Sequence, residues 1–312
     1  MALKIVEEAA LTDVGRQRSA NEDAYFATAP MFAVADGMGG AQAGEVASSM
    51  AVESIGGWQD GGSPEDALRE VIEDANRRIH ELSRSDESRA GMGTTLTAVV
   101  AGEHDISIGH VGDSRAYLFR DDELTRLTDD HSLVEELRKQ GKITAEEAET
   151  HPQRSIITRA LGPEGHVEVE TFSAPAKAGD LYLLCSDGLT SMVGDPRIGE
   201  ILRGGSSLES TARQLVDEAN ANGGRDNVTV VVFRLGEDVA EDADSDTLAG
   251  AETGAISVED VREAQAADAT AVISKQDVER AQADAEPDPP PTGVASSTAL
   301  RPPPPHSRPR KL

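Results

Sequence analysis

Five short motifs, spread along most of the chain, each contain a carboxylate and together give the clearest indication of chemistry. They are Arg18–Asp23, Asp36–Gly40, Gly112–Arg115, Ser186–Gly188 and Gly224–Asn227. Asp36 and Asp187 follow apolar runs that are typical of buried strands. A strand interior cannot hold an unpaired carboxylate, because desolvating the charge costs too much. Carboxylates at the mouths of several strands therefore suggest a cation held between them.

The type of ligand indicates which cation is expected. Asp36, Asp113, Asp187 and Asp226 offer oxygen ligands, and their motifs contain no cysteine or histidine. Such hard oxygen sites prefer Mg²⁺ or Mn²⁺ over Zn²⁺ or copper. A glycine after Asp36 lets the backbone approach closely, so the Gly37 carbonyl can serve as a further ligand. A single Asp-Gly pair is more often a plain turn, but five acidic motifs together favour the metal interpretation.

The elements that must position these carboxylates are predicted as runs of strands and pairs of helices. Strand patterns cover residues 31–35, 94–101, 105–111, 116–120, 167–172, 181–185 and 228–235. Helical patterns cover residues 43–55, 64–83, 132–140, 145–149 and 207–222. This order favours an antiparallel sandwich with helices outside over a strictly alternating βαβ fold.

Composition and charge exclude several function classes. The 312 residues have a formal net charge of −28, which argues against a nucleic-acid partner and against adsorption to an anionic membrane. No apolar run approaches the ~20 residues that span a bilayer, and no secretory segment opens the chain. The expected location is therefore the cytoplasm. Cys185 is the single cysteine, so no internal disulfide can form, and its apolar neighbours predict a buried, inert thiol.

The core-forming pattern stops near Leu235, which divides the chain. We predict a folded domain over residues 1–236 and an acidic, then proline-rich, largely disordered tail over 237–312. The tail contains a near-repeat, 256–269 and 273–285. Thr253 and Thr270 each precede an isoleucine by three residues, which resembles the phosphothreonine pattern read by forkhead-associated domains. One hypothesis is recruitment of such a partner after phosphorylation, and the alternative is chance in a linker rich in alanine and threonine.

Taken in order, the motifs resemble the metal-dependent serine/threonine protein phosphatases of type 2C, the PPM family. The similarity covers about Ile5 to Leu235. The matching segments are Thr12–Gly15, Arg18–Asp23, Asp36–Gly40, Gly91–Thr95, Val111–Ala116, Cys185–Leu189 and Arg225–Thr229. Met38 stands where animal members have a histidine, so the chain is similar to the bacterial branch. The resemblance implies an α+β fold of two stacked antiparallel β-sheets flanked by pairs of helices, with a catalytic domain over 1–236.

The resemblance also implies a role for each carboxylate. Asp36 would bridge two metals, Mn²⁺ or Mg²⁺, and Asp187 and Asp226 would complete the first metal site. The Gly37 carbonyl, with Glu22 acting through water, would complete the second.

Three further residues receive roles from the same match. Asp113, together with Asp187, resembles the weaker third metal site of bacterial members. Arg18 matches the arginine that binds the substrate phosphate. Asp23 lies among the outer-shell groups.

Physical chemistry favours the same function independently. Hydrolysis of a phosphate monoester is among the slowest uncatalysed reactions and needs strong electrostatic help. Two cations about 3.5–4 Å apart can share one hydroxide that attacks phosphorus, while Arg18 offers a planar fork of donors to the phosphoryl oxygens. Met38 cannot protonate the leaving alkoxide, so a metal-bound water is the expected acid.

The predicted function is a phosphoserine/phosphothreonine phosphatase that acts on phosphorylated proteins and opposes bacterial Ser/Thr kinases. Two alternatives remain: a catalytically silent scaffold of the same fold, and a hydrolase of small phosphoesters. The polar, helical segment from Leu127 to Leu161 is predicted to be a flap that gates protein substrates. For its two histidines, His131 and His151, a capping or loop role is favoured over metal binding.

Overall fold

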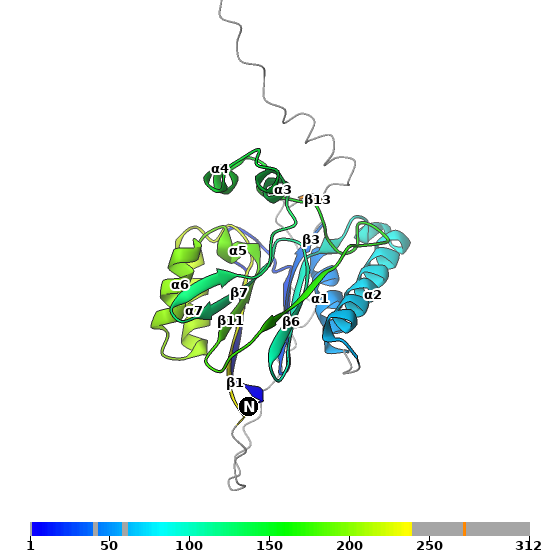
Figure 1. The fold of residues 1–312 in the computed structure, drawn as a ribbon. Coiled ribbons are helices and arrows are strands. Elements are labelled where there is room, and N and C mark those ends of the chain that lie inside the picture. The colour runs from blue at the N-terminus through cyan, green and yellow to red at the C-terminus, as the bar shows by residue number, and fades with distance from the viewer. Residues whose placement is uncertain (1, 40–42, 58–61, 239–270, 273–312) are drawn as a thin grey trace, which may run out of the picture.

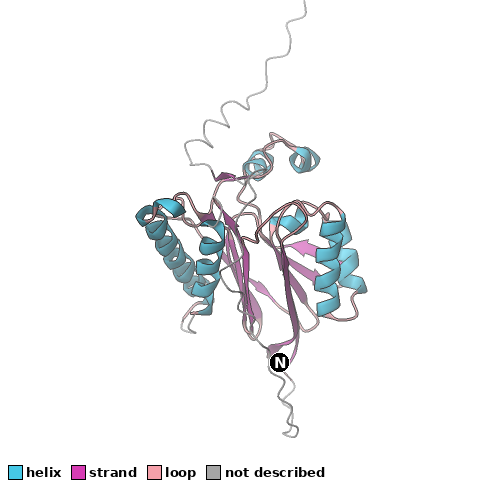
Figure 2. Ribbon diagram, turned by 180° about the vertical axis from the view of Figure 1, so that it is seen from behind, coloured by secondary structure: helices cyan, strands magenta, loops and turns pink. Residues whose placement is uncertain are grey.

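Two antiparallel sheets lie face to face, and helices cover the outer face of each sheet (Figure 1). The computed structural model describes residues 2–39, 43–57, 62–238 and 271–272. The view from behind shows the same four layers, helices, sheet, sheet, helices (Figure 2). The predicted α+β sandwich is confirmed.

The first sheet has five strands in the order β1-β12-β11-β7-β8. Their bounds are Leu3–Asp13 (β1), Val228–Glu237 (β12), Leu181–Cys185 (β11), Arg115–Arg120 (β7) and Glu123–Arg126 (β8). Strand β11 lies in the centre and is buried throughout, which is why its sequence reads as a continuous apolar run. The edge strand β1, which pairs with β12, is only partly buried.

The second sheet has six strands, five of them in the order β10-β6-β5-β3-β2, with β4 paired to β3. Their bounds are Glu170–Pro175 (β10), Asp105–Val111 (β6), Leu96–Ala101 (β5), Met31–Met38 (β3), Asp23–Thr28 (β2) and Gly93–Thr94 (β4). The register of β2 against β3 places Asp23 opposite Asp36. Two residues of the acidic motifs thus become neighbours through strand pairing.

Apolar side chains fill the space between the sheets and the space under each helix pair. Between the sheets, Phe32 stacks on Phe233 with 4.1 Å between the ring centroids, and Tyr182 stacks on Phe233 at 5.1 Å. Burial of such rings supplies much of the hydrophobic stabilisation. Val34 of β3 and Leu184 of β11 belong to this cluster between the sheets, so both strands are packed close to the points where Asp36 and Asp187 lie.

Helices α1 (Ala43–Gly56) and α2 (Pro64–Ser85) pack on the second sheet, and the short 3₁₀ helix Glu87–Arg89 follows α2. Helices α5 (Asp187–Thr190), α6 (Asp195–Gly204) and α7 (Leu208–Ala221) lie on the first sheet. Helix α7 begins at a capping box in which Ser207 and Ser210 bond each other's backbone N–H. No helix in the described ranges is both long and apolar enough to cross a membrane.

The predicted flap forms two short helices at the end of the sandwich, α3 (Leu133–Lys139) and α4 (Ala145–Thr150), and then the short strand β9 (Ile156–Ile157). Ser132 caps α3, and Thr144 forms a capping box with Glu147 at α4. Strand β13 (Ala271–Val272) pairs in parallel with β9.

Some element predictions need correction. The predicted elements lacked the strands β1, β2, β8, β9 and β13 and the helices α5 and α6, and the predicted strand 167–172 lies at Glu170–Pro175. Strands β1 and β2 are edge strands with mostly half-buried residues, so they lack the long apolar run that marks a central strand. The predicted tail, with both copies of its near-repeat and both Thr253 and Thr270, lies outside the described residues, apart from residues 237–238 and β13.

Candidate metal centre and phosphate site

The five acidic motifs converge at one end of the sandwich. Asp23 begins β2, Asp36 lies near the end of β3, Asp187 follows β11, and Asp226 precedes β12. Burial raises the pKa of the Asp36 carboxyl well above its ordinary value, and the charges of Asp23, Asp187, Asp226 and Asp113 raise it further. Four carboxylates close enough to affect a fifth form a single acidic cluster, as the sequence predicts.

The backbone of Asp36 is fixed from both sides by two threonines. Its carbonyl accepts hydrogen bonds from the Thr95 N–H and the Thr94 hydroxyl, both at 2.9 Å, and its N–H donates to Thr95 Oγ1 at 2.9 Å. Both threonines are fully buried. The side chain of Asp36 therefore starts from a backbone position that has little freedom to move.

Gly37 is required because helix α1 presses against it. A Cβ atom at Gly37 would lie 2.3 Å from the carbonyl oxygen of Gly44 and 2.4 Å from that of Glu22. The Gly37 N–H donates to the same Glu22 carbonyl at 3.1 Å. Close packing of three backbone segments explains the glycine that follows Asp36.

Asp187 and Asp226 lie at the ends of two paired strands, Asp187 after β11 and Asp226 before β12. Burial raises the pKa of Asp187 to about 6, the charge of Asp226 raises it too, and a hydrogen bond with Asp36 lowers it. Asp226 Oδ2 accepts a hydrogen bond of 2.8 Å from Arg18 Nη2. The guanidinium predicted to bind phosphate thus lies at the edge of the carboxylate cluster, half-buried.

Glu22 and Asp23 lie beside this cluster on the segment before β2. Burial raises the pKa of Glu22, against the opposing charge of Arg18. Burial raises the pKa of Asp23 to about 7, although hydrogen bonds from Thr229 and Ser186 lower it. Ser186 Oγ donates to Asp23 Oδ2 at 2.7 Å. Asp23 therefore sits behind Asp36, bonded to hydroxyl groups, in keeping with an outer position.

Asp113 approaches the cluster from the loop between β6 and β7. Its side chain is buried, and burial raises its pKa well above the ordinary value, as do the charges of Asp187 and Asp130, while Arg115 lowers it. The structure thus brings together all eight predicted site residues, which are Arg18, Glu22, Asp23, Asp36, Gly37, Asp113, Asp187 and Asp226.

Asn227 is a residue of the site that the sequence reasoning missed. Its Nδ2 donates to the carbonyls of Val14 and Ala20, both at 2.9 Å, and its Oδ1 accepts from the Glu22 N–H at 2.8 Å. A Cβ atom at Gly188 would lie 1.9 Å from the Asn227 carbonyl oxygen. This amide therefore ties the first acidic motif to the last. Its position directly after Asp226 was the available signal.

The donor set fits hard divalent cations. Asp23 Oδ1 and Asp187 Oδ1 are buried and lack a hydrogen-bond partner, and burial, followed by the neighbouring negative charges, raises the pKa of Asp36 and of Asp187. Oxygen ligands alone select Mg²⁺ or Mn²⁺. Within the described ranges, no three acidic, histidine or cysteine side chains already surround one metal position. Asp226 Oδ2 bonds Arg18, and Asp187 bonds Asp36, while Asp187 Oδ1 stays without a partner.

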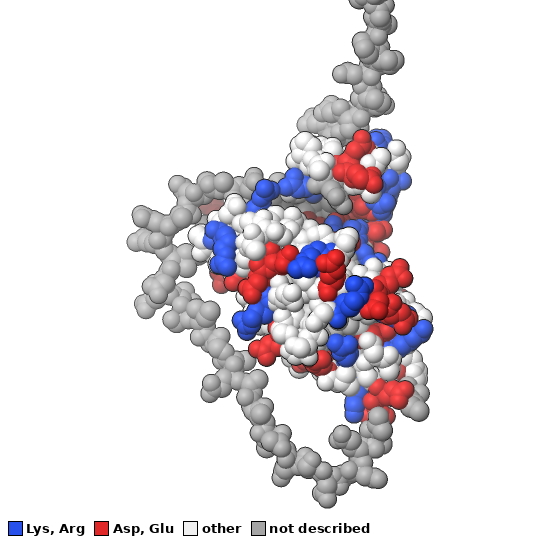
Figure 3. Space-filling model, turned by 90° about the vertical axis from the view of Figure 1, so that its left-hand side faces the viewer, with Lys and Arg blue, Asp and Glu red and all other residues white. Residues whose placement is uncertain are grey.

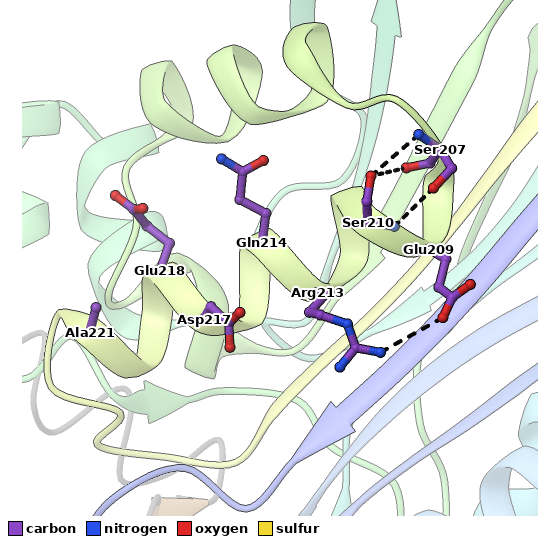
Figure 4. Close-up of a pocket in the computed structure, with 8 residues that line it drawn as sticks. All are labelled: Ser207, Glu209, Ser210, Arg213, Gln214, Asp217, Glu218 and Ala221. Carbon is purple, nitrogen blue, oxygen red and sulfur yellow. Dashed lines mark hydrogen bonds and ion pairs between the residues drawn. The ribbon is translucent and has the colours of Figure 1, made fainter.

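A surface hollow elsewhere does not compete with this site. It runs along the outer face of α7 and is lined by side chains such as Gln214 and Asp217 (Figure 4). Glu209 pairs with Arg213 there at 3.7 Å. None of the residues that line it belongs to the carboxylate cluster, and its side chains form ordinary caps and exposed ion pairs.

Comparison with known proteins agrees with this site. The family model of protein phosphatase 2C matches residues 15–228. The serine/threonine phosphatase stp of Listeria innocua is 43% identical over 233 residues, covering 71% of this chain and 92% of that protein. The serine/threonine protein phosphatase PstP of Mycobacterium tuberculosis is 44% identical over 232 residues, covering 73% of this chain and 45% of that protein.

Solved structures lead to the same group of proteins. The crystal structure of the Mycobacterium tuberculosis phosphatase PstP/Ppp superposes with a TM-score of 0.72 and 42% identity, covering 76% of this chain and all of that one. A structure of the PstP catalytic domain in complex with two manganese ions gives a TM-score of 0.70 and 39% identity, over 75% of this chain and all of that one. With this fold, this cluster and these relatives, the chain belongs to the protein phosphatase 2C family.

Proposed function

We infer that this chain is a metal-dependent protein serine/threonine phosphatase, which releases phosphate from phosphoserine and phosphothreonine in proteins. Relatives more than 40% identical over most of the chain are named serine/threonine phosphatases. The observation that carries the inference is the buried cluster around Asp36, in which four further carboxylates raise the pKa of that side chain.

The carboxylate cluster is the proposed binding site for two Mn²⁺ or Mg²⁺ ions. Asp36 would bridge them, Asp187 and Asp226 would complete the first site, and the Gly37 carbonyl with Glu22 through water would complete the second. Two bound cations would supply the positive charge that activates water and neutralises phosphoryl oxygens. The relative whose structure contains manganese supports this choice of metal.

Asp113 is the proposed ligand of a weaker third site, shared with Asp187. Burial raises the pKa of Asp113, and the charge of Asp187 raises it more than any other charged group does, which supports a cation shared by these two carboxylates. Asp23 is proposed as an outer-shell group, because its hydrogen bonds to Ser186 and Thr229 orient it beside Asp36.

Arg18 is the proposed contact to the substrate phosphate. Its Nη2 lies 2.8 Å from Asp226 Oδ2, and its charge influences Glu22 as well. A guanidinium held at the edge of an acidic site can present a planar pair of donors to a phosphoryl group. The contact with Asp226 orients the arginine before substrate binds and keeps it close to the carboxylates.

Met38 supplies no proton to the leaving alkoxide. Its side chain is buried against Ile157 and Ala160, at the base of the flap. A thioether has no dissociable proton, so the leaving group must take its proton from another source, for which a metal-bound water stays the prediction. The packing of Met38 instead joins the end of β3 to the flap.

Phosphorylated proteins are the proposed substrates, and bacterial Ser/Thr kinases are the proposed opposing enzymes. The side of the molecule in Figure 3 presents intermixed acidic and basic residues rather than a broad basic surface, in keeping with a protein partner rather than a nucleic acid. Recruitment of a forkhead-associated partner by Thr253 or Thr270 stays a hypothesis, because both lie outside the described residues. A role in signalling and a location in the cytoplasm also stay predictions.

Phosphate release from a phosphothreonine peptide tests the proposal, with Mn²⁺ or EDTA present and a small aryl phosphate measured in parallel. We expect Mn²⁺-dependent release that EDTA abolishes, with a higher kcat/KM for the peptide. Release from the aryl phosphate alone would favour the small-phosphoester alternative. No release from either substrate would favour the silent scaffold, although every predicted ligand is present in the chain.

A further inference from the structure

His131 lies where the flap begins, and it contacts the loop that carries Asp113. Its ring is 6% exposed. The His131 N–H donates to the Gly112 carbonyl at 2.8 Å, and the Gly112 N–H donates back to His131 Nδ1 at 3.1 Å. Both backbone groups of Gly112 are thus held by one residue. Gly112 directly precedes Asp113, so these two hydrogen bonds fix the backbone from which the Asp113 side chain extends.

The hydrogen bonds determine which ring nitrogen of His131 bears the proton. A backbone N–H can only donate, so Nδ1 must be unprotonated to accept from Gly112. The proton then lies on Nε2, which is 3.2 Å from Glu170 Oε2. Arg159 Nη1 also lies 3.4 Å from Nε2, but a guanidinium only donates, so it forms no hydrogen bond with a protonated Nε2. The His110 ring packs on the His131 ring at 4.7 Å between centroids. Glu170 on β10 therefore selects the form of the ring that Gly112 needs.

Gly112 is also connected to Asp36, through the side chain of Thr95. It has a φ of +112°, and a Cβ atom there would lie 2.5 Å from the side chain of Thr95. Thr95 holds both the N–H and the carbonyl of Asp36, and its hydroxyl lies 2.8 Å from Ser114 Oγ. A path of direct contacts thus runs from His131 through Gly112 and Thr95 to the backbone of Asp36.

The returning arm of the flap is attached to the same residue. The Thr158 N–H donates to the His131 carbonyl at 2.8 Å, and Ser132 forms a β-bridge with Ile157. Leu161, three residues after Thr158, pairs with Thr94 through N–H···O bonds of 2.9 and 3.0 Å. The two ends of the flap therefore meet at His131, next to the loop of Asp113.

We propose that His131 is a positioning residue for the phosphatase reaction: through Nδ1 it holds the Gly112–Asp113 loop in register with the flap and the carboxylate cluster. It touches neither substrate nor metal in this role. The proposal goes beyond the loop or capping role expected from the sequence, and it rests on the proposed function only where Asp113 is taken as a metal ligand.

Two substitutions separate this role from simple packing. In His131→Asn, the amide oxygen stands close to the place of Nδ1 and can still accept from Gly112, although the contact with Glu170 is lost. In His131→Gln, the side chain is nearer in size to histidine and can reach Glu170, but no acceptor remains near Gly112. If His131 served only for packing, His131→Gln should resemble the wild type more closely than His131→Asn does. The proposed role predicts the reverse.

The experiment combines hydrogen exchange of the metal-free protein with Mn²⁺ titrations of activity on a small aryl phosphate. For His131→Gln we expect at least about tenfold faster exchange over residues 112–115 and about tenfold more Mn²⁺ for half-maximal activity, the range found for outer-shell groups. His131→Asn should stay within about threefold of the wild type in both. His104→Asn, in the exposed β5–β6 turn, is the control and should change neither.

The opposite rank order, or equal losses in both variants with equal falls in Tm, would overturn the proposal. Should either variant fail to fold, the ¹⁵N resonances of His131 in the wild type decide: the proposal requires the proton on Nε2, and a proton on Nδ1 contradicts it. Asp113→Asn separates the two claims. If it leaves the Mn²⁺ response unchanged, the ligand role of Asp113 fails, while the exchange result still tests His131.

Discussion

Two buried charged regions lie next to the β6–β7 loop, and they differ in how their carboxylates are compensated: the pKa is raised in one and lowered in the other. Around Asp36, carboxylates crowd together and the pKa of that side chain is raised well above its ordinary value. Next to it, Arg115 binds both oxygens of Asp130, at 2.8 and 2.7 Å. Although burial raises the pKa of Asp130, the hydrogen bonds and charge of Arg115 bring it below its ordinary value.

The difference separates a binding site from a structural contact. A paired buried charge is satisfied within the fold, and breaking the pair is costly because the remaining charge has no partner. In the cluster around Asp36 the carboxylates outnumber the cations, and among them Arg18 pairs with Asp226, so the fold carries an unfavourable charge energy that a bound cation would lower. Raised pKa values with unpartnered oxygens therefore indicate a place for a ligand, whereas a bidentate ion pair indicates a structural joint.

The largest expected effect is on catalysis, from Asp36→Asn. The substitution removes the proposed bridging ligand, so kcat/KM for a phosphopeptide should fall by at least about 10²–10³-fold, the scale of losing one electrostatic element of an active site. The metal-free protein should become more stable, because mutual repulsion in the cluster decreases. Asp217→Asn on the exposed face of α7 is the control. Near wild-type activity in Asp36→Asn would remove the proposed role.

Asp130→Asn should show the reverse pattern. It leaves the Arg115 guanidinium buried without its charged partner, and we expect a loss of about 3–5 kcal/mol in the free energy of unfolding. Denaturant unfolding measures this loss. Asp122→Asn, in the exposed ion pair with Arg203, is the matched control and should cost under about 1 kcal/mol. Equal losses in the two variants would mean that the Arg115–Asp130 pair stabilises the fold no more than an exposed ion pair does.

Arg18→Lys should have an intermediate effect on substrate binding. Lysine keeps the charge but loses the planar pair of donors, so KM for the phosphopeptide should rise about tenfold, equivalent to about 1.4 kcal/mol, with a smaller change in kcat. Steady-state kinetics would show this. Arg213→Lys on α7 serves as the control. An unchanged KM would mean that Arg18 serves only to orient Asp226.

The smallest expected effect is the dependence of stability on pH. The pKa of Asp23 rises from 3.8 to about 7 and that of Asp187 from 3.8 to about 6 on folding. Between those values the folded state binds more protons than the unfolded state, so its stability falls as pH rises from about 4 to about 7. The metal-free protein should therefore have a Tm at least about 2–4 °C lower at pH 8 than at pH 5.5, the shift for roughly 1 kcal/mol. Mn²⁺ should reduce this difference, and a higher Tm at pH 8 without metal would contradict the assignment.

Much of the site could be predicted because its carboxylates follow recognisable apolar strands. Asp36 ends the run 31–35 and Asp187 follows 181–185, so the ordered motifs were enough to indicate a metal centre. The partners of Asn227 and Arg115 could not be predicted, because those bonds join segments brought together only by folding. Asn227 binds the carbonyl of Val14, for example, from a position 213 residues away.

The fold shows the same limit. Central strands such as β11 are apolar throughout and were found, whereas β1 and β2 are half-exposed edge strands and were not. The role of His131 likewise depends on Gly112, which lies 19 residues away. Hydrophobic periodicity in the sequence locates helices and strands, but it does not show which loops contact each of them in the fold.

Direct Mn²⁺ binding, measured by isothermal titration calorimetry on the wild type, Asp36→Asn and Asp217→Asn, tests the central claim most directly. We expect at least two Mn²⁺ ions per chain for the wild type and Asp217→Asn, and loss of that binding in Asp36→Asn. Full Mn²⁺ binding by Asp36→Asn would contradict the claim that this carboxylate cluster, with Asp36 at its centre, is the metal site.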